Sequence, residues 1–127
     1  MLQLTDVSRH FGGLQALSGV NMTVQPGKVT GLIGPNGAGK TTLINNISGL
    51  DHPTGGRITF DGHDITRRHP HEITRLGIAR TYQNIRLFGE MTALENLLIS
   101  QHAQGNASLL ESLVFSPRYR AEERRLR

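Results

Sequence analysis

Apolar and polar residues alternate at the start of the chain, and this alternation predicts two strands. Over residues 2–7 the apolar positions are separated by polar ones, which is typical of a half-buried strand. From Val20 onward the even-numbered positions are apolar again, which predicts a second strand over residues 16–25. The pair Pro26-Gly27 is a turn signal that ends it. The two strands predict a small antiparallel β layer.

A continuous apolar run comes next and leads into a glycine-rich loop. Residues 28–33 predict a third strand, buried on both faces. After the loop, residues 43–48 carry apolar side chains at helical spacing, and Gly49 is the expected stop of that helix. Strand, glycine-rich loop and helix in this order predict a nucleotide-binding α/β core.

Later segments carry signals for a hairpin, two short helices and one more strand. Asp61-Gly62 supports a two-residue hairpin turn within residues 57–65. Pro70 at a first-turn position opens a short helix that closes at Gly77, and residues 78–82 predict a strand that ends at Gln83. A capping box over residues 92–95 opens another helix. Apolar spacing over 109–114 predicts an amphipathic helix, and residues 118–127 are helix-like and charged.

The glycine-rich loop has the spacing G-x-x-x-x-G-K-T of a phosphate-binding P-loop. Its glycines let the backbone curl and present successive N–H groups to an anion, and the following helix adds its positive dipole end. Lys40 is placed to reach the β- and γ-phosphates, and the Thr41 hydroxyl can ligate Mg²⁺. The alternative is a glycine-rich turn before an ordinary helix. The predicted nucleotide-binding residues are Gly34, Pro35, Asn36, Gly37, Ala38, Gly39, Lys40, Thr41 and Thr42.

Composition narrows the possible partners only slightly. The 14 basic and 10 acidic residues give a net charge of +4, and most of this excess lies in residues 118–127, where five arginines face only two glutamates and indicate a solvated helix face. A nucleic-acid-binding P-loop module would interleave several aromatic residues with this basic run, and only Tyr119 occurs there. We therefore expect no nucleic-acid partner; salt-dependent nucleic-acid binding would test this alternative.

The absence of cysteine and of long apolar stretches excludes two further features from these 127 residues, cysteine-based cross-links or metal sites and membrane-spanning segments. The chain has no cysteine, so it has neither disulfides nor a thiolate metal site. No apolar stretch approaches 18 residues and the N-terminus does not resemble a signal peptide, so we expect membrane contact only through partners. His69-Pro70-His71 is more typical of surface residues at a helix start than of a metal site.

Two residues outside the P-loop carry a family resemblance. Phe11 lies in the loop expected after the first strand, and Gln83 follows a predicted strand well downstream of Lys40. With the hairpin between them, the chain resembles the N-terminal part of an ATP-binding cassette (ABC) transporter ATPase. The resemblance implies that Phe11 stacks on adenine and that Gln83 ligates Mg²⁺ and senses the transmembrane subunit. It makes Lys40 and Gln83 the catalytic residues of this chain and Thr41 and Gln83 its metal ligands.

The implied fold is α/β, a P-loop NTPase of ABC type with an N-terminal antiparallel β subdomain. Residues 1–127 would be the N-terminal part of the nucleotide-binding domain, with the P-loop at 34–42, the Q-loop around 83 and the start of a helical subdomain at about 92–127. The implied ligands are ATP and Mg²⁺. The implied partners are a second ATPase subunit and transmembrane permease subunits that contact residues 86–88, Arg86 to Phe88. The implied location is cytoplasmic, peripheral on the inner face of the plasma membrane.

A closer resemblance points to one group of importers. Residues 9–17, 77–88 and 90–97 are similar to the ATPase subunits of bacterial branched-chain amino acid importers. Related systems for urea or amides share much of this pattern, and a non-hydrolysing, nucleotide-dependent interaction module is a further alternative.

Several motifs of the complete family are absent from the sequence. Neither an L-S-G-G-Q signature nor an apolar strand ending in Asp-Glu follows Gln83. Leu17-Ser18-Gly19-Val20 lies before the P-loop inside a predicted strand, and Leu109-Leu110-Glu111 lacks both the strand length and the aspartate. We therefore expect a chain truncated before the signature motif and the Walker B strand, one that binds nucleotide weakly, hydrolyses little or none alone and exposes apolar faces of its nucleotide core.

Overall fold

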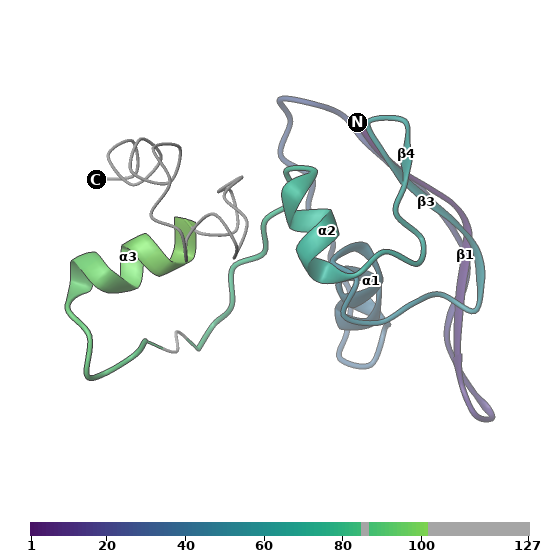
Figure 1. Cartoon of the computed structure of the whole chain (residues 1–127). Helices are drawn as coiled ribbons and strands as arrows, with labels where there is room; N and C mark the ends of the chain where they lie inside the picture. The colour runs from purple at the N-terminus through teal and green to yellow at the C-terminus, as the bar shows by residue number, and fades with distance from the viewer. Residues whose placement is uncertain (85–86, 102–127) are drawn as a thin grey trace. The chain divides into compact units, whose positions relative to one another are not determined.

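The computed structural model describes residues 1–84 and 87–101. The chain divides into two compact units, Met1–Arg80 and Thr81–Arg127 (Figure 1). The first unit holds a sheet and two helices, and the second holds the helix α3, Ala93–Gln101. Two predicted segments, the helix over 109–114 and the charged run 118–127, lie outside the described residues.

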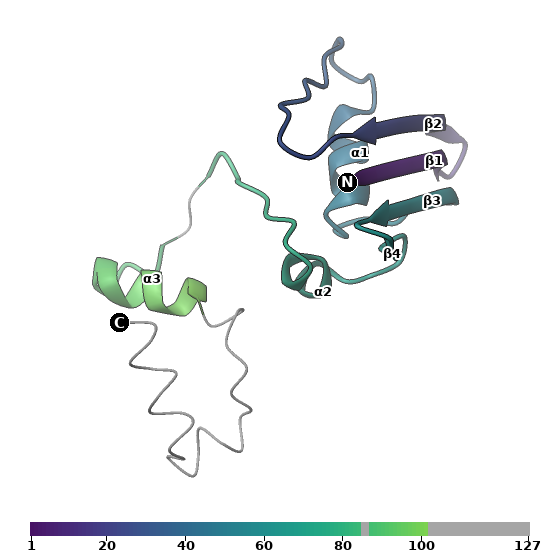
Figure 2. The same ribbon diagram turned by 90° about the horizontal axis from the view of Figure 1, so that it is seen from above.

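The first unit is built on a four-stranded antiparallel sheet of order β2-β1-β3-β4. Its strands are β1 (Leu2–Phe11), β2 (Leu14–Val24), β3 (Gly55–Phe60) and β4 (His63–Asp64). Figure 2 shows β2, β1 and β3 side by side, with the helix α1 against one face of the sheet. The predicted antiparallel β layer is therefore present, and the hairpin formed by β3 and β4 extends it.

The first strand is longer than the sequence predicts. β1 continues through residues 8–11, where a loop was expected, and Phe11 pairs with Leu14 across a turn at Gly12 and Gly13. The two-residue turn holds the ends of both strands together. Strand pairing therefore continues up to the turn, despite register shifts near Val7 and Arg9. Phe11 is thus the last residue of a strand, and the prediction that it lies in a loop is wrong.

The hairpin predicted around Asp61-Gly62 is confirmed. Thr59 pairs with Asp64 and Phe60 with His63, so the turn has two central residues. Their φ angles are 46° and 81°, both left-handed, as a type I′ turn requires. Asp and Gly are two of the residues that tolerate this conformation, which is why the sequence signal was dependable.

Two helices cover the sheet in the first unit. The predicted helix after the P-loop is α1, Lys40–Ile47, and the predicted short helix at Pro70 is α2, Pro70–Arg75. The side chains that these elements bury together form one hydrophobic cluster between helices and sheet. Its members are Leu4, Val7, Leu17, Leu43, Ile47, Ile58, Ile65 and Ile73, all of them buried. This cluster fixes α1, and with it the end of the P-loop, on the sheet.

Two predicted strands are absent. Residues 28–33 are irregular, and Val29 and Ile33 are almost fully exposed, at 102% and 92%. Residues 78–82 are also irregular, and Arg80 donates instead to the side-chain oxygens of Asn45 and Ser48, at 2.7 and 3.0 Å. A buried parallel strand needs hydrogen-bonding neighbours, and none of the four described strands pairs with either segment. The expected exposure of apolar residues in the nucleotide core is confirmed.

The capping box predicted before α3 is confirmed. The backbone N–H of Thr92 donates to Glu95 Oε2 at 2.8 Å, and the Glu95 N–H donates back to Thr92 Oγ1 at 3.3 Å. These reciprocal bonds satisfy two groups that a helix start leaves unpaired. Over residues 1–84 and 87–101, no helix is long or apolar enough to cross a membrane.

Candidate functional site

The glycine-rich loop ends at the start of α1 in a form suited to an anion. Gly39 is the N-cap residue with φ 81°, and no side chain caps the helix start. The first four N–H groups of a helix have no intrahelical partner, and the helix dipole makes this end positive. At α1 these donors adjoin the exposed loop of residues 34–38. A phosphate group has the charge and the acceptor oxygens to satisfy them.

Gly39 also brings the loop against the sheet. A Cβ at this position would lie 2.5 Å from the Ala16 carbonyl oxygen and 2.9 Å from Leu17 Cδ2. Ala16 and Leu17 belong to β2, so only a residue without a side chain allows this close approach. The loop is therefore anchored to β2 near the β1–β2 turn.

Lys40 curls back over the loop that precedes it. Its ammonium group donates to the carbonyl oxygens of Gly34 and Pro35, each at 2.6 Å. An ammonium has three donors, so one remains for a phosphate oxygen. Thr41 is exposed and Thr42 half-buried at the start of α1, which leaves the Thr41 hydroxyl accessible to a cation. The residues present fit a magnesium-bound triphosphate.

Phe11 lies at the same end of the sheet as the loop. Leu17, which Gly39 approaches, pairs with Arg9, and Phe11 follows two residues along β1. At about 3.3 Å per residue, this places Phe11 roughly 7 Å further along the strand. Its side chain is 46% exposed, so the ring is open to a ligand. The arrangement brings an aromatic face and a phosphate-binding loop together in one unit.

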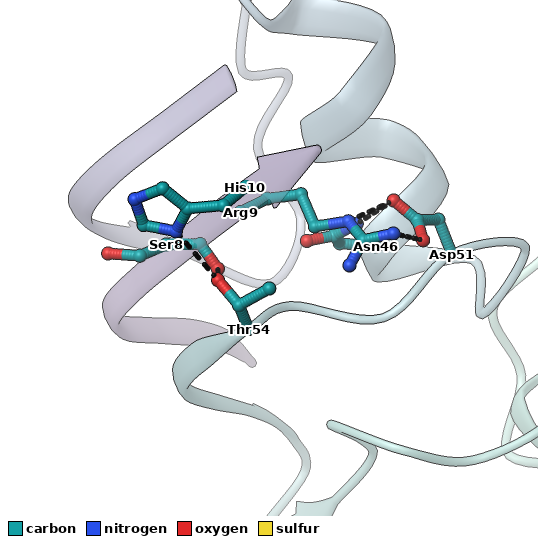
Figure 3. Close-up of polar contacts among 6 residues, drawn as sticks. All are labelled: Ser8, Arg9, His10, Asn46, Asp51 and Thr54. Carbon is teal, nitrogen blue, oxygen red and sulfur yellow. Dashed lines mark hydrogen bonds and ion pairs between the residues drawn. The ribbon is translucent and has the colours of Figure 1, made fainter. Parts of the chain in front are cut away.

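A polar cluster that the sequence did not reveal backs Phe11. Arg9 donates to both carboxylate oxygens of Asp51, from Nε at 2.8 Å and Nη2 at 2.6 Å, and Asn46 donates to the same carboxylate at 3.3 Å (Figure 3). The Arg9 guanidinium carbon lies 4.3 Å from the centre of the Phe11 ring. Residues so far apart in the sequence leave no periodic signal, so a single amino-acid sequence does not reveal that they pair.

Beside that ion pair, β1 is tied to the loop after α1. His10 Nδ1 and Thr54 Oγ1 are 3.0 Å apart, and the Thr54 backbone N–H donates to the Ser8 carbonyl oxygen at 2.8 Å (Figure 3). These contacts join the C-terminal end of β1 to the segment that leads into β3. The position of Arg9 relative to α1 is therefore fixed from two sides.

Gln83 belongs to the second unit and is exposed. Its pairing with Thr41 around Mg²⁺ therefore stays a prediction. In the same unit Leu87 and Phe88 are 70% and 58% exposed, and the side chain of Asn96 bonds both backbone groups of Phe88. Arg86, the first residue of the predicted permease contact, lies outside the described residues.

A concave region lies between the β3–β4 hairpin and α2. This hollow of about 490 Å³ is lined by Gly56, Arg57, Asp64, Thr66, Arg67, Arg68 and Glu72. Hydrogen bonds from Thr66 lower the pKa of the Asp64 carboxyl, and the backbone N–H of His69 lowers that of Glu72. Both carboxylates are therefore ionised at neutral pH and offset part of the arginine charge, so the hollow is a weaker anion site than the loop.

Two histidines at the start of α2 lie side by side. The rings of His69 and His71 stack with their centres 5.8 Å apart, and no group of three potential metal-ligating side chains occurs within the described part of the chain.

The family model for "ABC transporter" matches residues 17–125. The chain belongs to the ABC transporter family. It is 48% identical over 124 residues to the high-affinity branched-chain amino acid transport ATP-binding protein BraF of Pseudomonas aeruginosa. It is 42% identical over 120 residues to LivG of Escherichia coli K12, which carries the same description. The alignments cover 98% and 94% of this chain but 49% and 47% of the relatives. The chain thus spans about half the length of the curated relatives it matches.

Solved structures of ABC cassettes share the fold. The ADP conformation of MJ1267, an ATP-binding cassette of an ABC transporter, has a TM-score of 0.73 at 43% identity and is matched over 92% of this chain and 46% of its own. The dimeric ABC transporter cassette MJ0796 has a TM-score of 0.71 at 28% identity, over 86% and 50%. The predicted fold class, an α/β P-loop NTPase of ABC type with an N-terminal antiparallel β subdomain, is confirmed.

Proposed function

We propose that this chain supplies the nucleotide-binding face of an ABC importer ATPase that drives uptake of branched-chain amino acids. The observation that carries the nucleotide role is the uncapped start of α1, with Gly39 against β2 and Lys40 over the loop. The solute class is supported by the names of the relatives, BraF and LivG. Lower uptake of labelled leucine, but not of urea, after deletion of the gene would separate this solute from its alternatives.

Each part of the site has its own task in holding ATP. The backbone N–H groups at the start of α1 and the Lys40 ammonium would hold the phosphates, and Phe11 would stack on the base. The Thr41 hydroxyl, with Gln83 as the second proposed protein ligand, would hold Mg²⁺. When bound, the ion neutralises charge that develops on the transferred phosphoryl group.

Hydrolysis needs groups that the 127 residues do not contain. The sequence has no L-S-G-G-Q segment and no apolar strand that ends in Asp-Glu. A second ATPase subunit would cover the phosphates, a proposal supported by the dimeric cassette MJ0796. Permease subunits would dock near residues 86–88, and this docking would hold the protein at the cytoplasmic face of the membrane. By itself the chain would bind nucleotide with negligible turnover.

The test is titration of the chain with ATP and Mg²⁺, comparing Lys40→Ala with Lys28→Ala. Lys28 is the matched control, since it is the other lysine of the sequence and is exposed outside the P-loop. Loss of a charge-assisted hydrogen bond costs about 1.5–3 kcal/mol, so Lys40→Ala should weaken binding by roughly 10- to 100-fold. Lys28→Ala should leave it unchanged. Equal affinities in all three proteins would overturn the proposal, and phosphate release by the wild-type chain that Lys40→Ala abolishes would overturn its inactivity.

A further inference from the structure

The ion pair of Arg9 and Asp51 differs from an ordinary surface pair. Its two hydrogen bonds run in parallel from one guanidinium to one carboxylate, and both side chains are nearly four-fifths buried, at 22% and 21% exposure. Asn46, fully buried on α1, donates a further bond to Asp51. Exposed pairs contribute little because their side chains move freely. This guanidinium has a fixed position instead (Figure 3).

That fixed guanidinium lies over the ring of Phe11. Its carbon is 4.3 Å from the ring centre, within the range of a cation–π contact. Arg9 and Phe11 are two residues apart on β1, so their side chains emerge from the same face of the strand. Almost half of the Phe11 side chain remains exposed. The guanidinium therefore restrains the ring from one side while leaving aromatic surface open.

We propose that Arg9, held by Asp51, is a positioning residue that fixes Phe11 for stacking on a purine base. This inference rests on the proposed nucleotide function and adds a residue that acts through Phe11, without its own contact to the ligand. A ring at the tip of a hairpin would otherwise lose rotational freedom on binding, and restraint before binding removes part of that cost. The carboxylate that holds the restraint follows α1, the helix that begins at the phosphate-binding loop. The pair therefore also sets the distance between the base end and the phosphate end of the site.

A double-mutant cycle separates positioning from general stability. ATP affinity is measured for the full 127-residue chain, for Arg9→Gln, for Phe11→Ala and for the combined variant. Arg9→Gln should weaken ATP binding by about three- to tenfold when Phe11 is present, the range of a partly buried cation–π contact. It should change affinity less than twofold when Phe11 is already alanine. A purely structural role would give the same loss in both backgrounds.

A further variant keeps the test decisive if Arg9→Gln fails to fold, and a control variant accompanies it. Arg9→Gln combined with Asp51→Asn leaves no unpaired buried charge and should show the same loss of affinity with a near wild-type melting temperature. Arg75→Gln is the control, because Arg75 is an exposed arginine in the last turn of α2 and lies outside both the P-loop and the arginine-lined hollow. Its ATP affinity should equal that of the wild-type chain.

The outcomes distinguish this inference from the proposed function. Wild-type ATP binding that neither Arg9 variant changes would overturn the role of Arg9 alone. Equal losses with and without Phe11 would overturn it as well. Absence of ATP binding in the wild-type chain would overturn the nucleotide function and Arg9's role with it. Loss that appears only with Phe11 present would establish the positioning role.

Discussion

At the scale of single residues, Gly39 joins the phosphate-binding loop to the sheet. We predict that Gly39→Ala destabilises the chain by about 1–3 kcal/mol, because its φ of 81° is strained for alanine. The added Cβ would also meet the Ala16 carbonyl oxygen at 2.5 Å. Thermal or urea unfolding followed by circular dichroism measures the loss.

Gly27→Ala is the matched control for that prediction. Gly27 has a φ of 69°, but a Cβ there would meet nothing within 4 Å. The difference between the two variants isolates the contact with β2 from the backbone strain. Equal destabilisation would contradict the role of Gly39 in anchoring the loop.

Residue by residue, the candidate site was predictable wherever local sequence sets local structure. The P-loop residues follow from a short motif, and α1 does begin at Lys40. The position of Phe11 upstream of Lys40 predicts its role through the family resemblance, although Phe11 ends a strand and does not lie in a loop. The pairing of Arg9 with Asp51 is not predictable from one sequence, because it joins segments 42 residues apart and no periodicity indicates such a contact.

At the scale of elements, the start of α3 depends on an ionised carboxylate. The backbone N–H and the hydroxyl of Thr92 lower the pKa of Glu95. A group whose pKa is lower in the folded state stabilises that state above its ordinary pKa, about 4.3, and the contribution is lost as the pH falls through the lowered value. We therefore predict that α3 unwinds at its first turn under acidic conditions.

Thr92→Ala tests this capping arrangement directly. Carboxyl resonances followed by NMR as a function of pH should show the Glu95 midpoint rise toward its ordinary value. Glu72 is an internal reference, because the backbone N–H of His69 lowers its pKa and the substitution does not touch that bond. An unchanged Glu95 midpoint would show that the capping box does not form in solution.

Hairpins and capped helices form where the sequence predicts them, whereas the strands predicted over residues 28–33 and 78–82 do not form. Asp61-Gly62, Pro70 and the box at Thr92 each act within a few residues, so their signals suffice. The apolar runs 28–33 and 78–82 carry a strand pattern but need neighbours to pair with. Because the four described strands form their own antiparallel sheet, an apolar run alone could not become a strand.

At the scale of the whole molecule, the first unit combines a sheet and the phosphate-binding end of α1 in one folded body. Its hydrophobic cluster lies between the sheet and the helices, while Val29, Leu32 and Ile33 before the P-loop stay exposed. The loop is thus held firmly on the side of β2 and α1, through Gly39 and Leu43, and less firmly on the side of residues 28–33. We infer that nucleotide binding orders the loop from its α1 end.

Binding of the ATP phosphates by the loop at the start of α1 underlies the proposed function. The most direct measurement is backbone amide NMR of the labelled chain during titration with ATP and Mg²⁺. We expect the largest shifts at residues 36–42, and in Lys40→Ala the same shifts should need roughly 10- to 100-fold more ATP. Shifts confined to the arginine-lined hollow around Arg57 and Arg68, with residues 36–42 unchanged, would contradict it.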